Sequence, residues 1–199
     1  MAGPSAGPSP TVAIAYHSGN GHTTVLAQAV REGACDAGAA VVEVRVDTID
    51  ERQWRQLDDA DAIVFGAPTY MGTASAAFHT FAQATSGRWA EQAWADKAAA
   101  GFTVSGAKSG DKLHTLQYFG VFAAQHGMHW VSLGLLPGWN SSAGSEHDLN
   151  RLGFYLGAGG QAHVDLGPEA VTKADVETAR HLGARVARTA RRLASTPSG

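Results

Sequence analysis

Residues 11–24, TVAIAYHSGNGHTT, join an alternating apolar run to a short loop of small and polar residues. The run is typical of a buried strand, and apolar residues at helical spacing begin at Val25. Between them, Gly19 and Gly21 permit backbone conformations that a Cβ atom penalises. A strand, a loop and a helix N-terminus are therefore predicted. The free N–H groups and the dipole of such an N-terminus favour an anion, above all a phosphate.

Three kinds of phosphate site compete for this loop. The nucleotide P-loop needs Lys followed by Ser or Thr after its last glycine, and the chain has His22 and Thr23 there instead. The dinucleotide fingerprint needs a third glycine where Thr24 stands, although Asp47 near the end of the second predicted strand suits it. The remaining kind is a hydroxyl-lined pocket for a terminal phosphate monoester. A turn capped by a polar side chain such as Ser18, without any ligand, also stays open.

Length and composition predict one domain with a sizeable core. The chain has 199 residues, 44% of them hydrophobic, and we expect the domain at residues 11–194, between disordered tails at 1–10 and 195–199. A net charge of -3 predicts no nucleic-acid partner. No signal peptide or run long enough to span a bilayer is found, so no membrane association is expected. Cys35, the single cysteine, allows no intramolecular disulfide, which favours a reducing cytoplasm, and it is expected to be buried.

Apolar runs alternate with helical patterns in the order typical of an α/β protein with a parallel sheet. The prediction is an open twisted sheet of five parallel strands with helices on both faces. The strands are expected at residues 11–17, 40–46, 61–67, 98–105 and 129–133. The helices are expected at residues 22–36, 75–85, 111–126 and 173–193, with a short turn at 53–57.

The glycine-rich stretch 134–171 breaks this alternation. A loop of that length inside a domain is normally functional or contains a missed element. Residues 154–164 are expected to return and extend the edge of the sheet, while residues 137–150 cover a site or a partner surface; a solvated excursion is the alternative. Glu146, His147 and Asp148 are adjacent and lack the spacing of metal ligands, so no metal site is predicted.

Parallel strands bring their carboxyl ends to one edge of the sheet, where open α/β folds bind ligands. This rule selects three loops, at residues 17–23, 68–73 and 105–110. Each contains small residues that let backbone N–H groups approach a ligand. Tyr70 and Met71 add flat or polarizable surface for a ring. Three such loops at one edge predict a binding site.

With these loops, the chain resembles the flavodoxin-like NAD(P)H:quinone oxidoreductases of the tryptophan-repressor-binding protein A (WrbA) type. HSGNGHT resembles the Ser-x-x-Gly-His phosphate loop of that family, and FGAPTYMG resembles its Gly-x-Pro-Thr loop against the flavin ring. SGRWAEQAWADK resembles the Trp-bearing segment that follows, and AAQHGM resembles the His-Gly-Met motif. The likeness covers residues 11–189 and implies a flavodoxin-like fold.

The resemblance implies FMN as the cofactor and NADH or NADPH as the electron donor. The first loop would hold the FMN phosphate, with Ser18, Gly19, Asn20, Gly21, His22 and Thr23. The second loop would flank the isoalloxazine ring, with Pro68, Thr69, Tyr70, Met71, Gly72 and Thr73. The third loop would cover the polar pyrimidine edge of the ring, with Ser105, Gly106, Ala107, Lys108, Ser109 and Gly110.

Two catalytic residues are implied in the same way. His126 would approach the ring and tune its charge, and Trp89 would line a pocket that a neighbouring subunit completes, so a homodimer or homotetramer is expected. For His126, an interaction with the dipole at the C-terminus of its own helix is the alternative. Tyr70 and Met71 replace the Arg-Phe pair of that family. The resemblance therefore does not decide how well the chain binds a nicotinamide nucleotide.

The reaction implied is hydride transfer from NAD(P)H to FMN, followed by delivery of two electrons to a quinone in the same pocket. Two other roles stay open: a flavodoxin-type electron carrier, and a flavin-binding regulatory module without turnover. Carrier flavodoxins of that kind are typically strongly acidic. The nearly neutral charge of this chain and its extra Trp-bearing segment therefore favour the enzyme.

Overall fold

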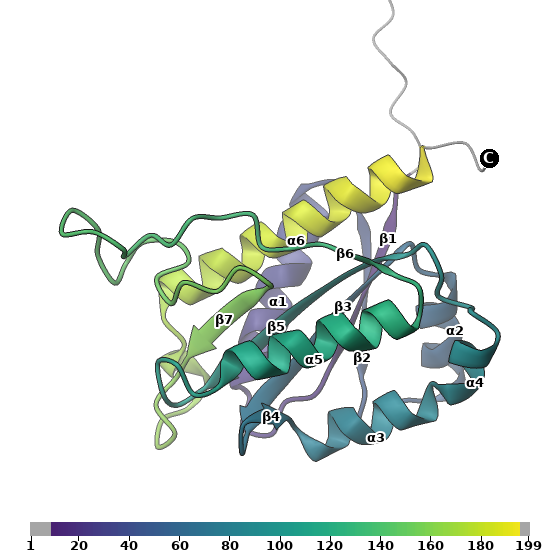
Figure 1. Ribbon diagram of the computed structural model, residues 1–199, viewed down its shortest axis with the longest axis horizontal. Coiled ribbons are helices and arrows are strands. Elements are labelled where there is room, and N and C mark those ends of the chain that lie inside the picture. The colour runs from purple at the N-terminus through teal and green to yellow at the C-terminus, as the bar shows by residue number, and fades with distance from the viewer. Residues whose placement is uncertain (1–8, 196–199) are drawn as a thin grey trace, which may run out of the picture.

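The computed structural model describes residues 9–195 and arranges them around one twisted sheet (Figure 1). Its strands are β1 (Thr11–Tyr16), β2 (Ala40–Arg45), β3 (Ala62–Tyr70), β4 (Thr73–Ala74), β5 (Ala98–Ser105), β6 (His129–Trp130) and β7 (Ala158–Gln161). Every neighbouring pair along the path β2-β1-β3-β5-β6 is parallel, and β4 adds a short antiparallel pair at the end of β3. This order, with β1 and β3 side by side at the centre, is the flavodoxin-like one.

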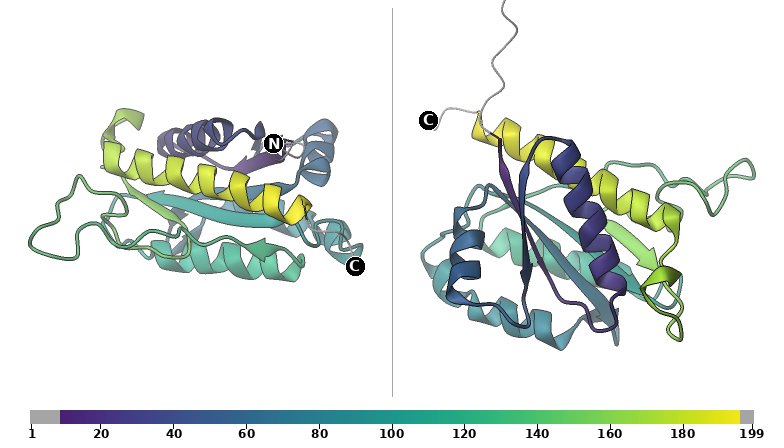
Figure 2. Two further views of the ribbon diagram at one scale, coloured as in Figure 1. Left: turned by 90° about the horizontal axis from the view of Figure 1, so that it is seen from above. Right: turned by 180° about the vertical axis from the view of Figure 1, so that it is seen from behind.

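Helices cover both faces of this sheet, as predicted. They are α1 (His22–Asp36), α2 (Glu51–Asp59), α3 (Ala76–Ala84), α4 (Ser86–Ala90), α5 (Lys112–Gln125), a 3₁₀ turn η1 (Pro168–Ala170) and α6 (Lys173–Ala194). One face carries α1 and α6, and the other carries α5 (Figure 2). Alternate side chains of β1 divide between two cores: Val12 and Ile14 pack toward α1 and α6, and Ala13 and Ala15 pack toward α2, α3 and α5.

Two glycines let α1 and α6 meet backbone to backbone. A Cβ atom at Gly33 would lie 1.8 Å from the carbonyl oxygen of Arg180, and one at Gly183 would lie 2.0 Å from that of Val30. Packed atoms do not approach so closely, so a side chain at either position would push the helices apart. This close contact fixes α1 in its position beneath the first predicted loop.

The outer edge of the sheet differs from the single fifth strand predicted at residues 129–133. Only His129 and Trp130 form β6, which pairs with the start of β5. The chain then leaves the sheet and returns as β7, which pairs with the end of β5. β6 and β7 therefore share one edge of the sheet, separated by a long excursion (Figure 1). The predicted return of residues 154–164 to this edge is confirmed.

Two local predictions are corrected. The turn expected at residues 53–57 is the helix α2, which begins with a capping box in which Asp50 and Gln53 exchange hydrogen bonds. Cys35 is exposed and not buried. The buried stripe of α1 consists of other residues, among them Val30 and Gly33, and Cys35 lies outside it.

The predicted tails lie outside the described residues, apart from Ser9, Pro10 and Ser195. Pro10 is buried, and its carbonyl oxygen accepts a hydrogen bond of 2.9 Å from the N–H of Ala40. Pro10 is therefore part of the domain, which was expected to begin at Thr11. Within the described range, none of the helices has the length and apolar character needed to cross a membrane.

Candidate functional site

The three predicted loops meet at the carboxyl ends of β1, β3 and β5, where they line one cavity of about 130 Å³. The lining residues are Asn20, His22 and Thr23 from the first loop, Pro68, Thr69 and Tyr70 from the second, and Val104, Ser105 and Gly106 at the third. Ala162 and Val164, which follow β7, complete the lining. These two were not among the predicted site residues, although the return of residues 154–164 to the sheet was the signal that pointed to them.

The first loop ends at the N-terminus of α1. Gly21 is the N-cap residue and has a φ of 87°, a left-handed conformation that favours glycine. The N–H groups of His22 and Thr23 open the helix and have no intrahelical acceptors, so they are available to an anion. The Ser18 hydroxyl is buried and accepts a hydrogen bond of 3.3 Å from the N–H of Thr24, which holds the loop in place.

The imidazole of His22 connects this loop to the segment that follows β7. Its Nε2 donates to the carbonyl oxygens of Leu166 and Gly167, each at 2.9 Å. Nearby, a Cβ atom at Gly21 would lie 2.6 Å from the Cγ of Pro168. The segment after β7 therefore packs closely against the first loop, and His22 has a structural role that its sequence motif does not indicate.

Tyr70 brings the second loop against the first. Its hydroxyl oxygen would lie 2.7 Å from a Cβ atom at Gly19, so a side chain there would displace the Tyr70 hydroxyl. Thr69 forms hydrogen bonds with two other buried threonines. Its Oγ1 lies 2.8 Å from the Oγ1 of Thr103 in β5 and 2.8 Å from that of Thr115 in α5. These contacts fix the start of the second loop to the sheet and to α5.

The end of the second loop lies apart from this cavity. Met71 is fully exposed with a φ of 49°, and Gly72 has a φ of 86°. Together with Thr73 they line a separate hollow of about 380 Å³ that Asp111 and His114 complete. The Nδ1 of His114 donates to the carbonyl oxygen of Gly72 at 2.7 Å. The turn is thus fixed in place from α5.

The third loop contributes only its beginning to the cavity, because Ala107, Lys108 and Ser109 are exposed. The Nζ of Lys108 lies 5.3 Å from the ring centroid of Trp139 in the excursion. Behind the loop lies Lys112, which is fully buried and was not predicted as a site residue. Its Nζ donates to the Ser105 hydroxyl at 2.8 Å and to the Ala107 carbonyl oxygen at 2.6 Å. Burial lowers the pKa of Lys112 to about 8.

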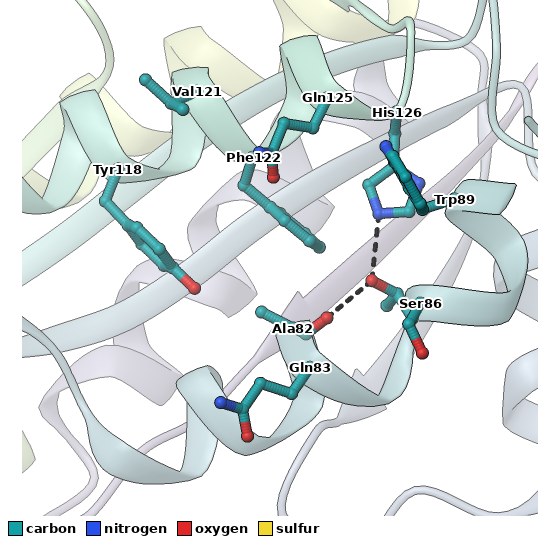
Figure 3. A pocket seen from close by; sticks show the side chains of 10 residues that line it. Ala82, Gln83, Ser86, Trp89, Tyr118, Val121, Phe122, Gln125 and His126 are labelled. Carbon is teal, nitrogen blue, oxygen red and sulfur yellow. Dashed lines mark hydrogen bonds between the residues drawn. The ribbon is translucent and has the colours of Figure 1, made fainter.

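Within one copy of the chain, the structure separates His126 and Trp89 from the three loops. α5 begins beside the carboxyl end of β5 and ends at His126, near the start of β5, and a helix of 14 residues is about 20 Å long. His126 and Trp89 instead line a second pocket, of about 460 Å³ (Figure 3). Its other residues are Ala82, Gln83, Thr85, Ser86, Tyr118, Val121, Phe122 and Gln125. Within one subunit, His126 therefore lies away from the loops that are predicted to hold the ring, and its approach to the ring stays a prediction.

The imidazole of His126 is buried in this second pocket. Its Nε2 lies 3.0 Å from the Oγ1 of Thr85, and its ring packs against that of Trp94 at a tilt of 35°, with 4.7 Å between centroids. Among the described residues, its Nδ1 has no hydrogen-bond partner. Burial lowers the pKa of His126, so the neutral form is favoured. The pocket thus holds one unpaired polar atom among aromatic surfaces, while Trp89 is 52% exposed at its rim.

Known proteins resemble the chain over nearly its whole length. The family model for NADPH-dependent FMN reductases matches residues 11–137. The chain belongs to this family. It is 45% identical over 181 residues to flavodoxin FldP of Pseudomonas aeruginosa, covering 90% of this chain and 96% of that protein. It is 31% identical to the NAD(P)H quinone oxidoreductase YCP4 of Candida albicans, over 92% of this chain and 68% of that one.

A solved structure shows the same fold. The flavodoxin, WrbA-like protein from Agrobacterium tumefaciens is 40% identical, with a TM-score of 0.74 over 92% of this chain and 99% of that one. The resemblance drawn from the sequence motifs is thereby confirmed. This member of the FMN reductase family is an enzyme that uses FMN and NAD(P)H.

The residues of the three-loop cavity fit FMN. The start of α1 offers backbone N–H donors to a phosphate, and the hydroxyl of Thr23 adds a donor without adding positive charge. Pro68, Val104 and Tyr70 give apolar surface suited to a flat ring. The donor set therefore suits a phosphate at one end of the cavity and a ring at the other.

Proposed function

We propose that this enzyme passes two electrons from NADH or NADPH, through FMN, to a quinone. The observation that carries the proposal is the meeting of three loops at one cavity beside the free N–H groups of α1. Bound FMN would supply the hydride and electron chemistry, while the chain orients it and excludes water. A quinone as the acceptor is supported by the activity in the name of the Candida albicans relative.

In this proposal the phosphate of FMN binds at residues 18–23 and its pyrimidine edge lies at residues 105–110. The enclosed cavity, about 130 Å³, is smaller than the roughly 300–1,000 Å³ of whole ligand sites. We therefore place much of the ring over the exposed part of the second loop, from Tyr70 to Thr73. One face of the ring would then be open to a nicotinamide or a quinone.

We further propose that a second copy of the chain covers this open face with its Trp89, at the rim of the pocket that holds His126. Half of the side chains that line the pocket around these two residues are apolar or aromatic, and two of them, Trp89 and Val121, are 52% and 61% exposed. Exposed aromatic anchors are enriched in interfaces. Because α5 separates the two sites within one chain, only another copy can bring them together. A closed homodimer or homotetramer satisfies this requirement.

The test is consumption of NADH and NADPH by the FMN-loaded protein with benzoquinone as the acceptor. We expect steady oxidation that depends on both the protein and the quinone. The 45% identity to a flavodoxin motivates the alternative of an electron carrier, which would show no such turnover yet exchange electrons with a protein partner. Bound FMN without electron transfer of either kind would indicate a regulatory module. The single cysteine, Cys35, suits a cytoplasmic location for each of these roles.

A further inference from the structure

Lys112 is a buried cation directly behind the loop of residues 105–110. Its relative exposure is 0%, and lysines are almost never fully buried unless they are paired. The charged groups that act on it are Asp175 of α6 and Arg151 of the excursion, which pair with each other at 2.8 Å. Two cations and one carboxylate leave one positive charge in the interior at neutral pH. Such a charge is costly to bury, and functional sites are where proteins retain one.

Ser105 connects this charge to the cavity. Its hydroxyl accepts a hydrogen bond of 2.8 Å from the Lys112 Nζ, and the same residue lines the cavity. Because the lysine occupies a lone pair of the Ser105 oxygen, the hydroxyl proton is available to donate. Its acceptor within the chain is the carbonyl oxygen of Ala107, at a long 3.3 Å. A ligand oxygen or nitrogen at the cavity offers a better acceptor.

The charge matters because of what hydride transfer does to a flavin. A hydride from NAD(P)H carries two electrons and one proton, so the oxidised ring gains one negative charge unless a second proton joins it. Positive charge fixed beside the ring therefore favours the reduced form.

We propose that Lys112 is a positioning residue that, through Ser105, holds one positive charge at the pyrimidine edge of FMN and favours its reduced, anionic form. This inference rests on the proposed function, in which residues 105–110 cover that edge.

The protonation state of Lys112 adds a pH dependence. Burial lowers its pKa to about 8, an effect that Asp175 opposes and Arg151 strengthens. In the oxidised protein the charge is therefore present at pH 7 and lost as the pH rises through about 8. A negative ring nearby would raise that pKa again. Above about pH 8, two-electron reduction should thus take up one proton more than at pH 7.

The experiment compares the FMN-loaded wild type with Lys112→Met, Lys112→Arg and Lys97→Met. Lys97 is the matched control, because its Nζ, like that of Lys112, donates to two acceptors of the chain. These acceptors are the backbone carbonyl oxygens of Asp58 and Ala60, near the start of β5 and away from the three loops. Titration with oxidised FMN gives the affinity, and spectroelectrochemistry at pH 7 gives the reduction potential. The two together give the affinity for reduced FMN relative to oxidised FMN.

We expect Lys112→Met to lower this affinity ratio about tenfold, which is about 30 mV for a two-electron couple. Lys112→Arg keeps the charge and should stay near wild type, and Lys97→Met should not change the ratio. Equal ratios in wild type and Lys112→Met would overturn the inference. If the wild type bound no FMN, the proposed function would fail and the inference with it.

A measurement on the wild type covers the case in which Lys112→Met does not fold. Its potential should fall more steeply with pH above about 8, by about 30 mV per pH unit for the extra proton. A slope that stays the same from pH 7 to pH 9.5 would overturn the inference.

Discussion

Arg151 and Asp175 form a bidentate salt bridge whose two side chains are 3% and 2% exposed. The guanidinium donates through Nε at 2.9 Å and through Nη2 at 2.8 Å. Asp175 also accepts the N–H of Gln161 in β7 at 2.9 Å. Because Arg151 belongs to the excursion and Asp175 to the first turn of α6, the pair ties three segments of the chain together.

Breaking this pair should be costly. Asp175→Leu leaves the Arg151 guanidinium buried without its partner, and we expect a loss of about 3–5 kcal/mol in the free energy of unfolding. The double variant Arg151→Met, Asp175→Leu should recover most of that loss, because it buries no charge. Urea titration measures both. The exposed pair of Arg180 with Asp36 is the control, and Asp36→Asn should cause only a small loss, because water screens this pair. A loss that small for Asp175→Leu would contradict the prediction.

Riboflavin should bind far more weakly than FMN. The donors at the start of α1 suit a phosphate, and two charge-assisted hydrogen bonds at about 1.5–3 kcal/mol each amount to a factor of about 100 or more. Fluorescence titration of each flavin measures this ratio. Thr23→Val removes a hydroxyl that lines the cavity, so it should weaken FMN and leave riboflavin unchanged. Equal affinity for the two flavins would remove the phosphate site.

Gly72→Val should weaken FMN in a protein that still folds. The φ of 86° at Gly72 is strained for a residue with a Cβ atom, at a cost of roughly 1–2 kcal/mol, while nothing lies within 4 Å of the added atom. The strain and the added bulk both fall where we place the ring. Gly87→Val is the control. Gly87 lies in α4, away from the proposed ring site, and a Cβ atom there would also have nothing within 4 Å. An FMN affinity unaffected by Gly72→Val would show that this turn does not meet the flavin.

Trp89→Ala should slow quinone reduction and leave FMN bound. Truncating an exposed aromatic anchor at an interface typically costs about 2 kcal/mol or more of association. Light scattering at micromolar concentration should therefore show a dimer or tetramer for the wild type and a weakened assembly for the variant. A monomeric wild type whose turnover does not depend on Trp89 would contradict the proposal that two copies of the chain form the substrate site.

His126 should make the fold sensitive to mild acid. Burial lowers its pKa in the folded protein, whereas the unfolded chain titrates near about 6.5. The unfolded chain then binds more protons below that value, so the free energy of unfolding falls as the pH drops through it. His126→Gln should lose less stability between pH 7.5 and pH 5.5 than the wild type. Burial also lowers the pKa values of His17 and His181, but these two residues add the same pH dependence of stability to the wild type and to His126→Gln. Equal losses would count against a buried neutral imidazole.

Local patterns predicted the elements whose burial is regular along the chain. The predicted bounds 22–36 and 98–105 coincide with α1 and β5, because an apolar stripe and an apolar run define them. The sequence predicts only a turn at α2, because Leu57 is the one buried residue of this helix, although Asp50 and Gln53 carry the capping-box signal. Because the other residues of α2 are not buried, the spacing of apolar residues does not reveal this helix.

Other features of the site depend on how the elements pack in three dimensions, which local sequence patterns do not reveal. Three loops at one sheet edge follow from the parallel strand order, so most of the cavity was predictable. The position of His126 depends on α5 running its whole length away from those loops, which a motif alone does not reveal. Lys112 was missed for a similar reason: a lysine in the first turn of a helix gives no local sign that it is buried.

β6 and β7 lie at an outer edge of the sheet, which decides how freely the chain between them can change. An edge strand has a neighbour on one side only, so it can be interrupted without leaving a second strand unpaired. Trp130 pairs with Ala99 and Ala158 with Phe102, which leaves two positions, opposite Ala100 and Gly101, to be bridged. A two-residue link would therefore make one continuous strand. A change in the length of the excursion would therefore leave every other strand pair intact, provided that Arg151 still reaches Asp175.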